Sequence, residues 1–220
     1  MIKVHGLSLS NHSSMIKFAL KEKNIDYEWI ETLPYSMSKD DSILEKSAIG
    51  ALPIIEYQGE YISETLAIFS FLEKTFPDVR LFSEDPLEFA KTIEIINICQ
   101  FYIELQARNF YPFIFFGGKK PEGNIDVIKD KIDMGLKSLE RKASLNPYMI
   151  NNFSYADIYA SFSIFTTIPV CKQIYDWDIL QDFKKVNDSL NVINSRDIAK
   201  SVYDEVSKAM ENLNNTALKK

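Results

Sequence analysis

The spacing of apolar and polar residues divides the chain into two parts with different periods. In the first part, short apolar or alternating runs predict strands, and stretches with helical periodicity separate them. A polar turn, Gln58-Gly59, predicts a hairpin. Pro77 is expected to end the helix that follows this hairpin, Glu64–Thr75. The predicted strands are Ile2–Gly6, Tyr27–Leu33, Leu52–Tyr57 and Tyr61-Ile62, and the predicted helices are Met15–Lys23, Asp40–Lys46 and Glu64–Thr75.

Two local features of this first part are also predicted. Ser13 or Asn11 would serve as the N-cap of the first helix, and Pro34–Lys39 is expected to be a loop. A parallel strand pair joined by a helix must cross over right-handed, so these elements favour a small α/β layer.

After Pro86 no strand alternation appears, and helical patterns continue to the polar tail at Asn214–Lys220. The predicted helices are Leu87–Tyr111, Asn124–Ala143, Ser154–Ile168 with a stop near Pro169, Asp178–Leu190 and Arg196–Leu213. The chain therefore predicts an α/β domain followed by an all-α domain. The expected boundaries are 1–76 for the first domain, 77–85 for a linker and 86–220 for the second domain.

Composition narrows the class of protein. The chain has 220 residues, 46% of them apolar and 25% charged, as in an ordinary globular protein. Its net charge of −6 argues against broad binding to nucleic acid or to an anionic membrane. Because the start lacks a secretory pattern and no apolar run approaches the roughly 20 residues of a membrane span, we expect a soluble, cytoplasmic protein.

The cysteines and histidines exclude other kinds of site. Cys99 and Cys171 lie in strongly apolar stretches, which predicts buried free thiols. The absence of a CxxC motif excludes a redox thioredoxin or glutaredoxin. The two histidines, His5 and His12, have no metal-ligand spacing, so no metal site is expected.

Two motifs remain. Between Ser47 and Leu72, a proline before an apolar strand is followed by a helix that opens with Glu64-Thr65, an order that suits a pocket for a peptide-like anion. Ser154 and Asp157 have the S-x-x-D spacing of a capping box, which predicts a folding role. Replacing Asp157 with Ala is expected to destabilise the protein by roughly 1–2 kcal/mol.

Four segments, in this order, resemble the cytosolic glutathione S-transferase family, in its bacterial, serine-type form. They are SLSNHSSMIKFALKEKNIDYE, IGALPIIEYQGEYISETLAIFSFLEKTFP, ARNFYPFIFFGG and NNFSYADIYA. The resemblance covers most of the chain. It implies a thioredoxin-like, glutathione-binding first domain, an all-α second domain that contributes the electrophile site, a homodimer, and a role in detoxification with glutathione as co-substrate.

The resemblance also implies roles for residues of the first domain. Pro53 matches the family's cis-proline, and the backbone of Leu52 before it would bind the cysteinyl part of glutathione. Glu64 would pair with the α-ammonium of the γ-glutamyl group, while Thr65 and the helix N-terminus would bind its α-carboxylate. Ser63 as a plain N-cap is the structural alternative for this motif.

Ser10 matches the serine whose hydroxyl donates a hydrogen bond to the glutathione sulfur. Such a donor at a helix N-terminus favours thiolate over thiol and so lowers the pKa of the bound thiol. Serines that only cap a helix are the alternative. Tyrosine-type chemistry is disfavoured because no tyrosine precedes Tyr27, and cysteine-type chemistry is excluded because no cysteine precedes Cys99.

The sequence departs from the family at the site for the glycyl carboxylate. Ser47-Ala48-Ile49-Gly50 replaces the common Asn-Pro-x-Gly, and Ala51 replaces the usual Lys, Arg or Gln. Lys39 or Lys46 would have to compensate. The electrophile site implied by the resemblance lies between the Leu7–Ser10 loop and the end of the first long helix, where the candidates are Tyr102, Gln106, Arg108, Tyr111 and Phe115.

Three functions remain open from sequence alone. The first is an enzyme in which glutathione attacks a small hydrophobic electrophile or reduces a peroxide. The second is a non-catalytic regulator or ligand-binding protein with the same fold, which Ala51 favours. The third, a glutathione-dependent isomerase or dehalogenase, shares every first-domain residue with the first.

Overall fold

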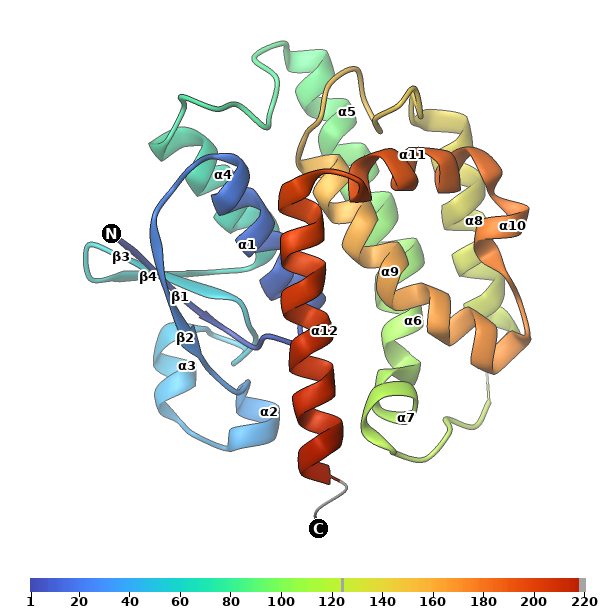
Figure 1. The fold of residues 1–220 in the computed structure, drawn as a ribbon, viewed down its shortest axis with the longest axis horizontal. Helices are drawn as coiled ribbons and strands as arrows, with labels where there is room; N and C mark the ends of the chain where they lie inside the picture. Colours follow the sequence, from blue (N-terminus) through green and yellow to red (C-terminus); the bar gives the residue numbers. More distant parts are fainter. Residues whose placement is uncertain (124, 218–220) are drawn as a thin grey trace. The chain divides into compact units, whose positions relative to one another are not determined.

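A computed structural model of the chain describes residues 1–123 and 125–217, with side chains described up to residue 211. The chain forms two compact units (Figure 1). The first unit comprises Met1–Arg80 together with the segment from Arg196 onward, and the second comprises Leu81–Ser195. The last helix therefore groups with the N-terminal part of the chain, and the domain boundaries expected from sequence stay a prediction.

The first unit contains a four-stranded mixed sheet in the order β2-β1-β3-β4, which confirms the thioredoxin-like fold. The strands lie where the apolar runs predict them. The elements are β1 (Ile2–Gly6), α1 (Asn11–Glu22), β2 (Tyr27–Glu31), α2 (Tyr35–Ser38), α3 (Ser42–Lys46), β3 (Ile54–Tyr57), β4 (Glu60–Ser63), α4 (Thr65–Thr75) and α12 (Asp197–Ala217).

Two expectations for this unit were wrong. Helix α1 begins at Asn11 rather than Met15, and its N-cap is Ser10, whose Oγ accepts a hydrogen bond from the N–H of Ser13. The segment expected to be a loop contains α2, which directly follows Pro34. A proline sets its own φ near the helical value, so it can precede one turn of helix without an apolar period to reveal it.

The core of the first unit lies between the sheet and two helices. Val4, Ile54 and Ile55 of the sheet are fully buried. Helices α1 and α4 pack against each other, and both contribute apolar side chains at helical spacing. Those fully buried residues are Met15, Ile16, Phe18, Ala19 and Leu20 from α1, and Ile68, Phe69 and Leu72 from α4.

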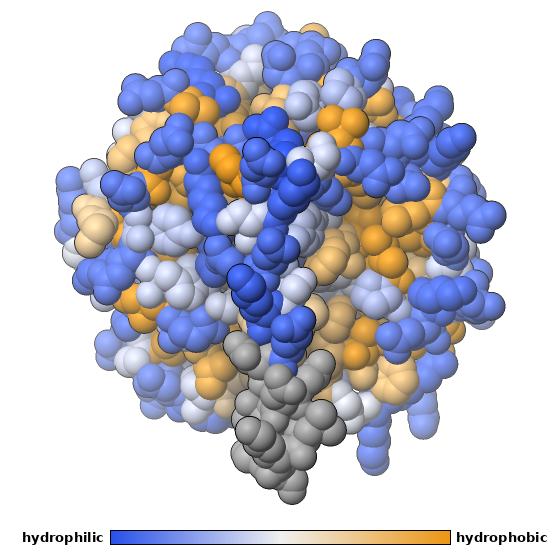
Figure 2. Space-filling model, viewed as in Figure 1, coloured by the Kyte–Doolittle hydropathy of each residue, from blue (hydrophilic) through white to orange (hydrophobic). Residues whose placement is uncertain are grey.

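Helix α12 packs on α1 through one apolar stripe. Ala199, Val202 and Val206 are buried at a spacing of three and four residues, the period of one helix face. The outward face of the helix is hydrophilic, as Figure 2 shows. Ion pairs also join this segment to α1: Arg196, just before α12, pairs with Glu22 at 2.7 Å, and Glu205 of α12 pairs with Lys17 and Lys21 at 2.9 and 2.6 Å.

The second unit is helical throughout its regular elements, as predicted. The expected long helix at Leu87–Tyr111 changes its winding along its length, because a π-helical segment at Ile98–Glu104 and a 3₁₀ turn at Arg108–Phe110 interrupt it. The α-helices are α5 (Pro86–Asn97), α6 (Leu105–Ala107), α7 (Tyr111–Phe116), α8 (Ile125–Lys142), α9 (Tyr155–Tyr175), α10 (Ile179–Asp182) and α11 (Lys184–Asn194).

Helix α9 continues past the proline that was expected to end it. Pro169 cannot donate a hydrogen bond to the carbonyl of Phe165, yet the helix runs to Tyr175. Val170 and Cys171 beyond it are fully buried, so packing of the last turns outweighs the lost hydrogen bond. The next predicted helix is also divided, because Phe183 separates α10 from α11.

Two other expectations concern the thiols and the start of α8. Cys99 and Cys171 are free and buried, as predicted, and burial raises the pKa of both thiols. The expected start of a helix at Asn124 lies outside the described residues. In residues 1–123 and 125–217, none of the helices combines the length and apolarity needed to span a bilayer.

Candidate functional site

Strand register brings four segments of the first unit to one edge of the sheet. Strand β1 pairs in parallel with β2, so Gly6 lies opposite Glu31 where both strands end. Strand β3 runs antiparallel to its neighbours, and its first residue, Ile54, pairs with His5 and Ser63. The segments that leave the sheet at this edge are Leu7–Ser10 after β1, Thr32 after β2, Leu52-Pro53 before β3 and Glu64-Thr65 after β4.

Two helix N-termini meet at this edge. His12 is in the first turn of α1, and its Nδ1 lies 2.8 Å from Oγ1 of Thr65, the first residue of α4. The first N–H groups of a helix lack intrahelical acceptors and carry a partial positive charge, which attracts anions. The edge therefore offers two adjacent positions for anionic groups, one at α1 and one at α4.

The serines before and within the first turn of α1 differ in what their hydroxyls do. Ser8 Oγ donates to Glu31 Oε2 at 2.6 Å, and Ser14 Oγ donates to the carbonyl of Ser10 at 3.0 Å. Ser13 is fully buried, and its Oγ accepts from the N–H of Leu7. Ser10 is half-buried, and within the described residues its hydroxyl proton has no acceptor.

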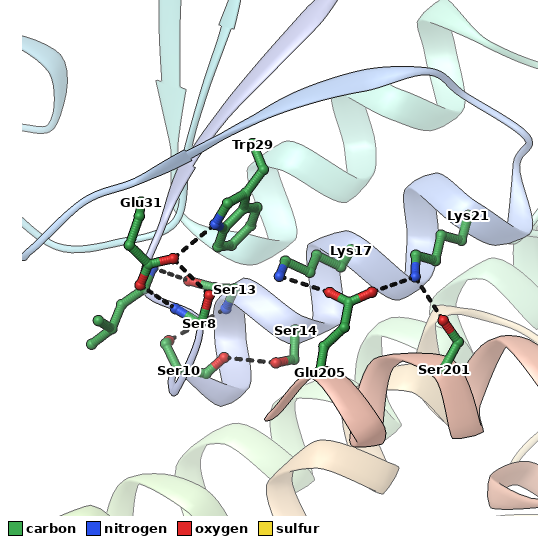
Figure 3. A network of polar contacts seen from close by, with 11 residues as sticks. Ser8, Ser10, Ser13, Ser14, Lys17, Lys21, Trp29, Glu31, Ser201 and Glu205 are labelled. Atoms are coloured by element: carbon green, nitrogen blue, oxygen red, sulfur yellow. Dashed lines mark hydrogen bonds and ion pairs between the residues drawn. The ribbon is translucent and has the colours of Figure 1, made fainter. Parts of the chain in front are cut away.

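The loop that carries Ser10 is anchored to the end of β2 (Figure 3). Glu31 accepts from the N–H of Ser8 at 2.9 Å, from Ser8 Oγ at 2.6 Å and from Trp29 Nε1 at 2.8 Å. Partial burial opposes ionisation of this carboxyl, but the hydrogen bonds from Ser8 and Trp29 outweigh burial and lower the pKa of Glu31. Glu31 is therefore a carboxylate that holds the loop in place.

A second part of this network reaches α12 (Figure 3). The Lys17 ammonium lies 3.7 Å from the centre of the Trp29 ring and 2.9 Å from Glu205 Oε2. Lys21 contacts the other oxygen of Glu205 at 2.6 Å and Ser201 Oγ at 2.8 Å. Because the Lys17 side chain is nearly inaccessible to water, Glu205 supplies the counter-charge that its burial requires.

The segments expected to bind a peptide-like ligand have unusual backbone conformations. The Leu52-Pro53 peptide bond is cis, which confirms that expectation. Glu64, rather than Ser63, is the N-cap of α4, and its φ is +71°, in a region that non-glycine residues seldom occupy. Such an outlier costs on the order of 1–3 kcal/mol and is concentrated at ligand sites. The Glu64 carboxylate is exposed and Thr65 is buried.

The lysine expected near the glycyl carboxylate lies on an exposed turn. Lys39 follows α2 with a φ of +58°, and its ammonium lies 5.5 Å from the centre of the Tyr35 ring. The N–H of Tyr35 donates to the carbonyl of Gly50 at 2.9 Å, which joins this turn to the loop that carries Ala51. Gly50 itself has a φ of +65°, and a Cβ there would lie 2.4 Å from Tyr35 Cβ.

In the second unit, three of the five electrophile candidates lie together. Arg108 forms an ion pair with the buried Glu104, Tyr111 donates to Thr166 Oγ1 at 2.7 Å, and the rings of Tyr111 and Phe115 meet edge to face. Burial, together with Glu104, raises the pKa of Tyr111, so this phenol is a neutral donor. Tyr102 is exposed and packs by Gly135 of α8, while Gln106 donates to the carbonyl of Phe101.

The capping box at the start of α9 is confirmed. Ser154 Oγ accepts from the N–H of Ala156, and Asp157 accepts from the N–H and Oγ of Ser154 at 2.8 and 2.9 Å. Asp157 also accepts from the N–H of Met149 at 2.8 Å. Burial of Asp157 raises its pKa to about 6, against these hydrogen bonds, which lower it.

Sequence reasoning did not identify four residues that make contacts at the candidate sites: His12, Trp29 and Glu31 at the edge of the sheet, and Glu104 beside Arg108. From sequence His12 is tested only as a metal ligand, and its place in the first turn of α1 follows from the observed start of that helix at Asn11. Glu31 and Trp29 alternate along a strand that ends at the candidate edge, which was a usable signal. Glu104 gave no signal, because its partner Arg108 is one of many charges at helical spacing. Among the described residues, no group of three or more His, Cys, Asp or Glu could hold a metal ion.

Comparison with known proteins adds independent information. Residues 4–80 match the family model described as "Glutathione S-transferase, N-terminal domain". A glutathione S-transferase of Pseudomonas putida is 30% identical over 194 residues, which are 88% of this chain and 87% of the relative.

Solved structures share the fold. Glutathione transferase F2 from Populus trichocarpa has a TM-score of 0.80 at 17% identity, over 94% of this chain and 100% of the other. A glutathione S-transferase from Methylobacillus flagellatus, solved with GSH bound, has a TM-score of 0.74 at 15% identity, over 92% and 98% of the two chains. With the Pseudomonas relative matched over most of both sequences, this chain belongs to the glutathione S-transferase family.

Proposed function

We propose that the chain binds glutathione at the edge where α1 and α4 begin, and that it activates the thiol for attack on a small hydrophobic electrophile. The observation that carries this proposal is the Ser10 hydroxyl, whose proton has no acceptor among the described residues although three neighbouring serines are bonded or buried. An uncommitted donor at a helix N-terminus stabilises a thiolate over a thiol.

Glutathione has two anionic groups that match the two positions for anions at the N-termini of α1 and α4. Its thiolate is assigned to Ser10 at α1, and its γ-glutamyl α-carboxylate to Thr65 and the N–H groups of α4. Glu64 receives the α-ammonium, and the backbone of Leu52 beside the cis peptide bond receives the cysteinyl part. Lys39, on the turn joined to Gly50, is the cation assigned to the glycyl carboxylate.

The reaction needs little covalent help from the protein. With an aryl halide, the thiol proton passes to water, the sulfur forms a bond to the ring carbon, and the halide leaves with its bonding electrons. Ser10 lowers the free energy of the thiolate, and binding brings the sulfur and the ring together. We assign the electrophile to the cluster of Arg108, Tyr111 and Phe115 in the second unit, while Tyr102 and Gln106 stay candidates on sequence grounds alone.

The assembly is part of the same proposal. We expect a homodimer, in a cytoplasmic enzyme, because the chain belongs to the cytosolic-type glutathione S-transferase family, for which both are the expectation. Sedimentation equilibrium at micromolar concentration tests it. A mass equal to one 25.4 kDa chain would contradict the dimer and leave the chemistry at Ser10 unaffected.

The test of function combines binding and rate. Calorimetric titration with glutathione should show binding to the wild type, and the wild type should conjugate a general aryl halide. Ser10→Ala should lower kcat/KM by about 30- to 100-fold, since a hydrogen bond to a charged group contributes about 1.5–3 kcal/mol. The ultraviolet absorbance of bound thiolate should show that the pKa of the bound thiol is higher in this variant.

A matched control is available on α4. Ser70 is exposed and its Oγ donates to the carbonyl of Leu66, so Ser70→Ala removes a helix serine that is not assigned to the ligand and should keep the wild-type rate. A Ser10→Ala variant with the full rate would contradict the proposed mechanism. A wild type that fails to bind glutathione at millimolar concentration would contradict the proposed function itself.

A further inference from the structure

The proposed function assigns no role to the histidine in the first turn of α1. His12 is half-buried in the first turn of α1, and its Nδ1 lies 2.8 Å from Thr65 Oγ1. Thr65 is the residue assigned to the α-carboxylate of the ligand, and it is largely buried, with 6% of its surface exposed. The imidazole is therefore in direct contact with the hydroxyl on which carboxylate binding depends.

The number of protons in this contact limits what the hydroxyl can do. A threonine hydroxyl carries one proton, and a neutral imidazole donates from only one of its two nitrogens. If Thr65 donates to Nδ1, its oxygen presents only lone pairs to a ligand, and these repel a carboxylate. If Nδ1 carries the proton and donates to Thr65 Oγ1, the hydroxyl proton of Thr65 is free to point at the carboxylate.

We propose that His12 is a positioning residue for the ligand carboxylate, which donates from Nδ1 to Thr65 Oγ1 and so turns the Thr65 hydroxyl into a donor toward the ligand. This inference rests on the proposed function. It makes His12 a determinant of specificity, since a ligand with a carboxylate at this position benefits from the oriented hydroxyl, whereas a ligand that lacks the carboxylate does not.

The contact between His12 and Thr65 joins the N-termini of the two helices that form the proposed site. His12 belongs to α1 and Thr65 to α4, and both are in the first turn of their helices. A hydrogen bond between them fixes the distance between the position assigned to the thiolate and the position assigned to the carboxylate. Loss of the imidazole therefore affects carboxylate recognition first, and thiolate chemistry only through the spacing.

The experiment measures binding rather than turnover. Calorimetric titrations compare glutathione with γ-aminobutyryl-cysteinyl-glycine, which has hydrogen in place of the α-carboxylate. The proteins are the wild type, His12→Phe, His12→Asn, Thr65→Val and His12→Phe with Thr65→Val. An asparagine amide nitrogen can take the place of Nδ1 as donor, so His12→Asn is the conservative variant. Thermal melts establish that each variant is folded.

His12→Phe should weaken glutathione binding about tenfold and change binding of the truncated ligand by less than twofold. His12→Asn should bind glutathione within about threefold of the wild type, and His12→Phe should have no further effect once Thr65 is Val. Equal losses for both ligands would show a merely structural role and overturn the inference, as would wild-type affinity in His12→Phe. Failure of the wild type to bind glutathione would instead refute the proposed function on which the inference rests.

Discussion

Two helices of this protein begin with a serine N-cap, and the two caps differ in how fully their polar groups are satisfied. At α9, Ser154 and Asp157 satisfy each other, and Asp157 also holds the N–H of Met149. At α1, Ser10 accepts one hydrogen bond of 3.3 Å from Ser13 and donates none within the described residues. We call the Ser154 cap of α9 the closed cap and the Ser10 cap of α1 the open cap.

The same local motif, a serine N-cap, can serve either stability or ligand binding, depending on whether its hydrogen bonds are satisfied within the protein. A closed cap satisfies orphan N–H groups inside the protein, so its whole effect is on stability. An open cap leaves a donor and a positive helix end facing outward, so part of its capacity is left for a ligand. Sequence alone favours a capping serine at both places, and only the neighbouring hydrogen bonds distinguish them.

The largest effect is expected at the closed cap. Asp157→Ala leaves the buried N–H groups of Met149 and Ser154 without their acceptor and should lower the free energy of unfolding by about 3 kcal/mol. This exceeds the roughly 1–2 kcal/mol expected from sequence, because the contact with Met149 could not be foreseen. Urea denaturation measures it. A normal unfolding midpoint together with lost catalysis would contradict the folding role.

The closed cap should also produce a pH dependence. Burial raises the pKa of Asp157 from 3.8 to about 6, so between these values the folded state binds more protons than the unfolded state. The resulting stabilisation is complete below the unfolded pKa and is lost as pH rises through about 6. The stability of the wild type minus that of Asp157→Asn should fall by on the order of 3 kcal/mol over this window. A pH-independent difference would show that the carboxyl is not shifted.

A smaller effect is expected from the residue that anchors the open cap. Glu31→Ala removes the acceptor of Ser8 and Trp29 and should lower kcat/KM for conjugation about tenfold, which is about 1.4 kcal/mol, by loosening the loop that carries Ser10. Glu28, exposed on the same strand, gives the matched control Glu28→Ala. Equal rates in the two variants would mean that the anchor is dispensable.

The smallest effect is on the stability of the open cap itself. Ser10→Ala removes only the long hydrogen bond from Ser13 and should lower the free energy of unfolding by about 1 kcal/mol or less. The same variant is expected to lose most of its activity, so the comparison predicts opposite profiles for Ser10 and Asp157. A destabilisation of Ser10→Ala as large as that of Asp157→Ala would remove the distinction between the caps.

Much of the fold follows from local patterns. The strand at Ile2–Gly6, the strand predicted at Tyr27–Leu33 and observed at Tyr27–Glu31, the hairpin at Gln58-Gly59 and the capping box at Ser154 follow from sequence, because each depends on residues close in the chain. The continuation of α9 through Pro169 was not predicted, since it depends on burial by distant elements.

The candidate site divides in the same way. Ser10, Thr65 and Pro53 lie in motifs that can be recognised from the sequence. The cis bond before Pro53 is confirmed, and the roles of Ser10 and Thr65 in ligand binding are proposals. The contact of His12 with Thr65 and that of Glu31 with Ser8 join segments far apart in the chain. Pairings of this kind are fixed by strand register and helix packing, which no local pattern contains.

The first unit is discontinuous in sequence, and this has a consequence for synthesis. Its sheet and first helices come from residues up to Arg80, but Glu205, the counter-charge of Lys17, is made more than a hundred residues later. During translation the amino-terminal segment must therefore exist without its last helix while all of the second unit emerges from the ribosome. Until Glu205 has been made, Lys17 lacks the carboxylate that it contacts in the folded unit, so this unit reaches its final packing only after synthesis of α12 and not on completion of the sheet.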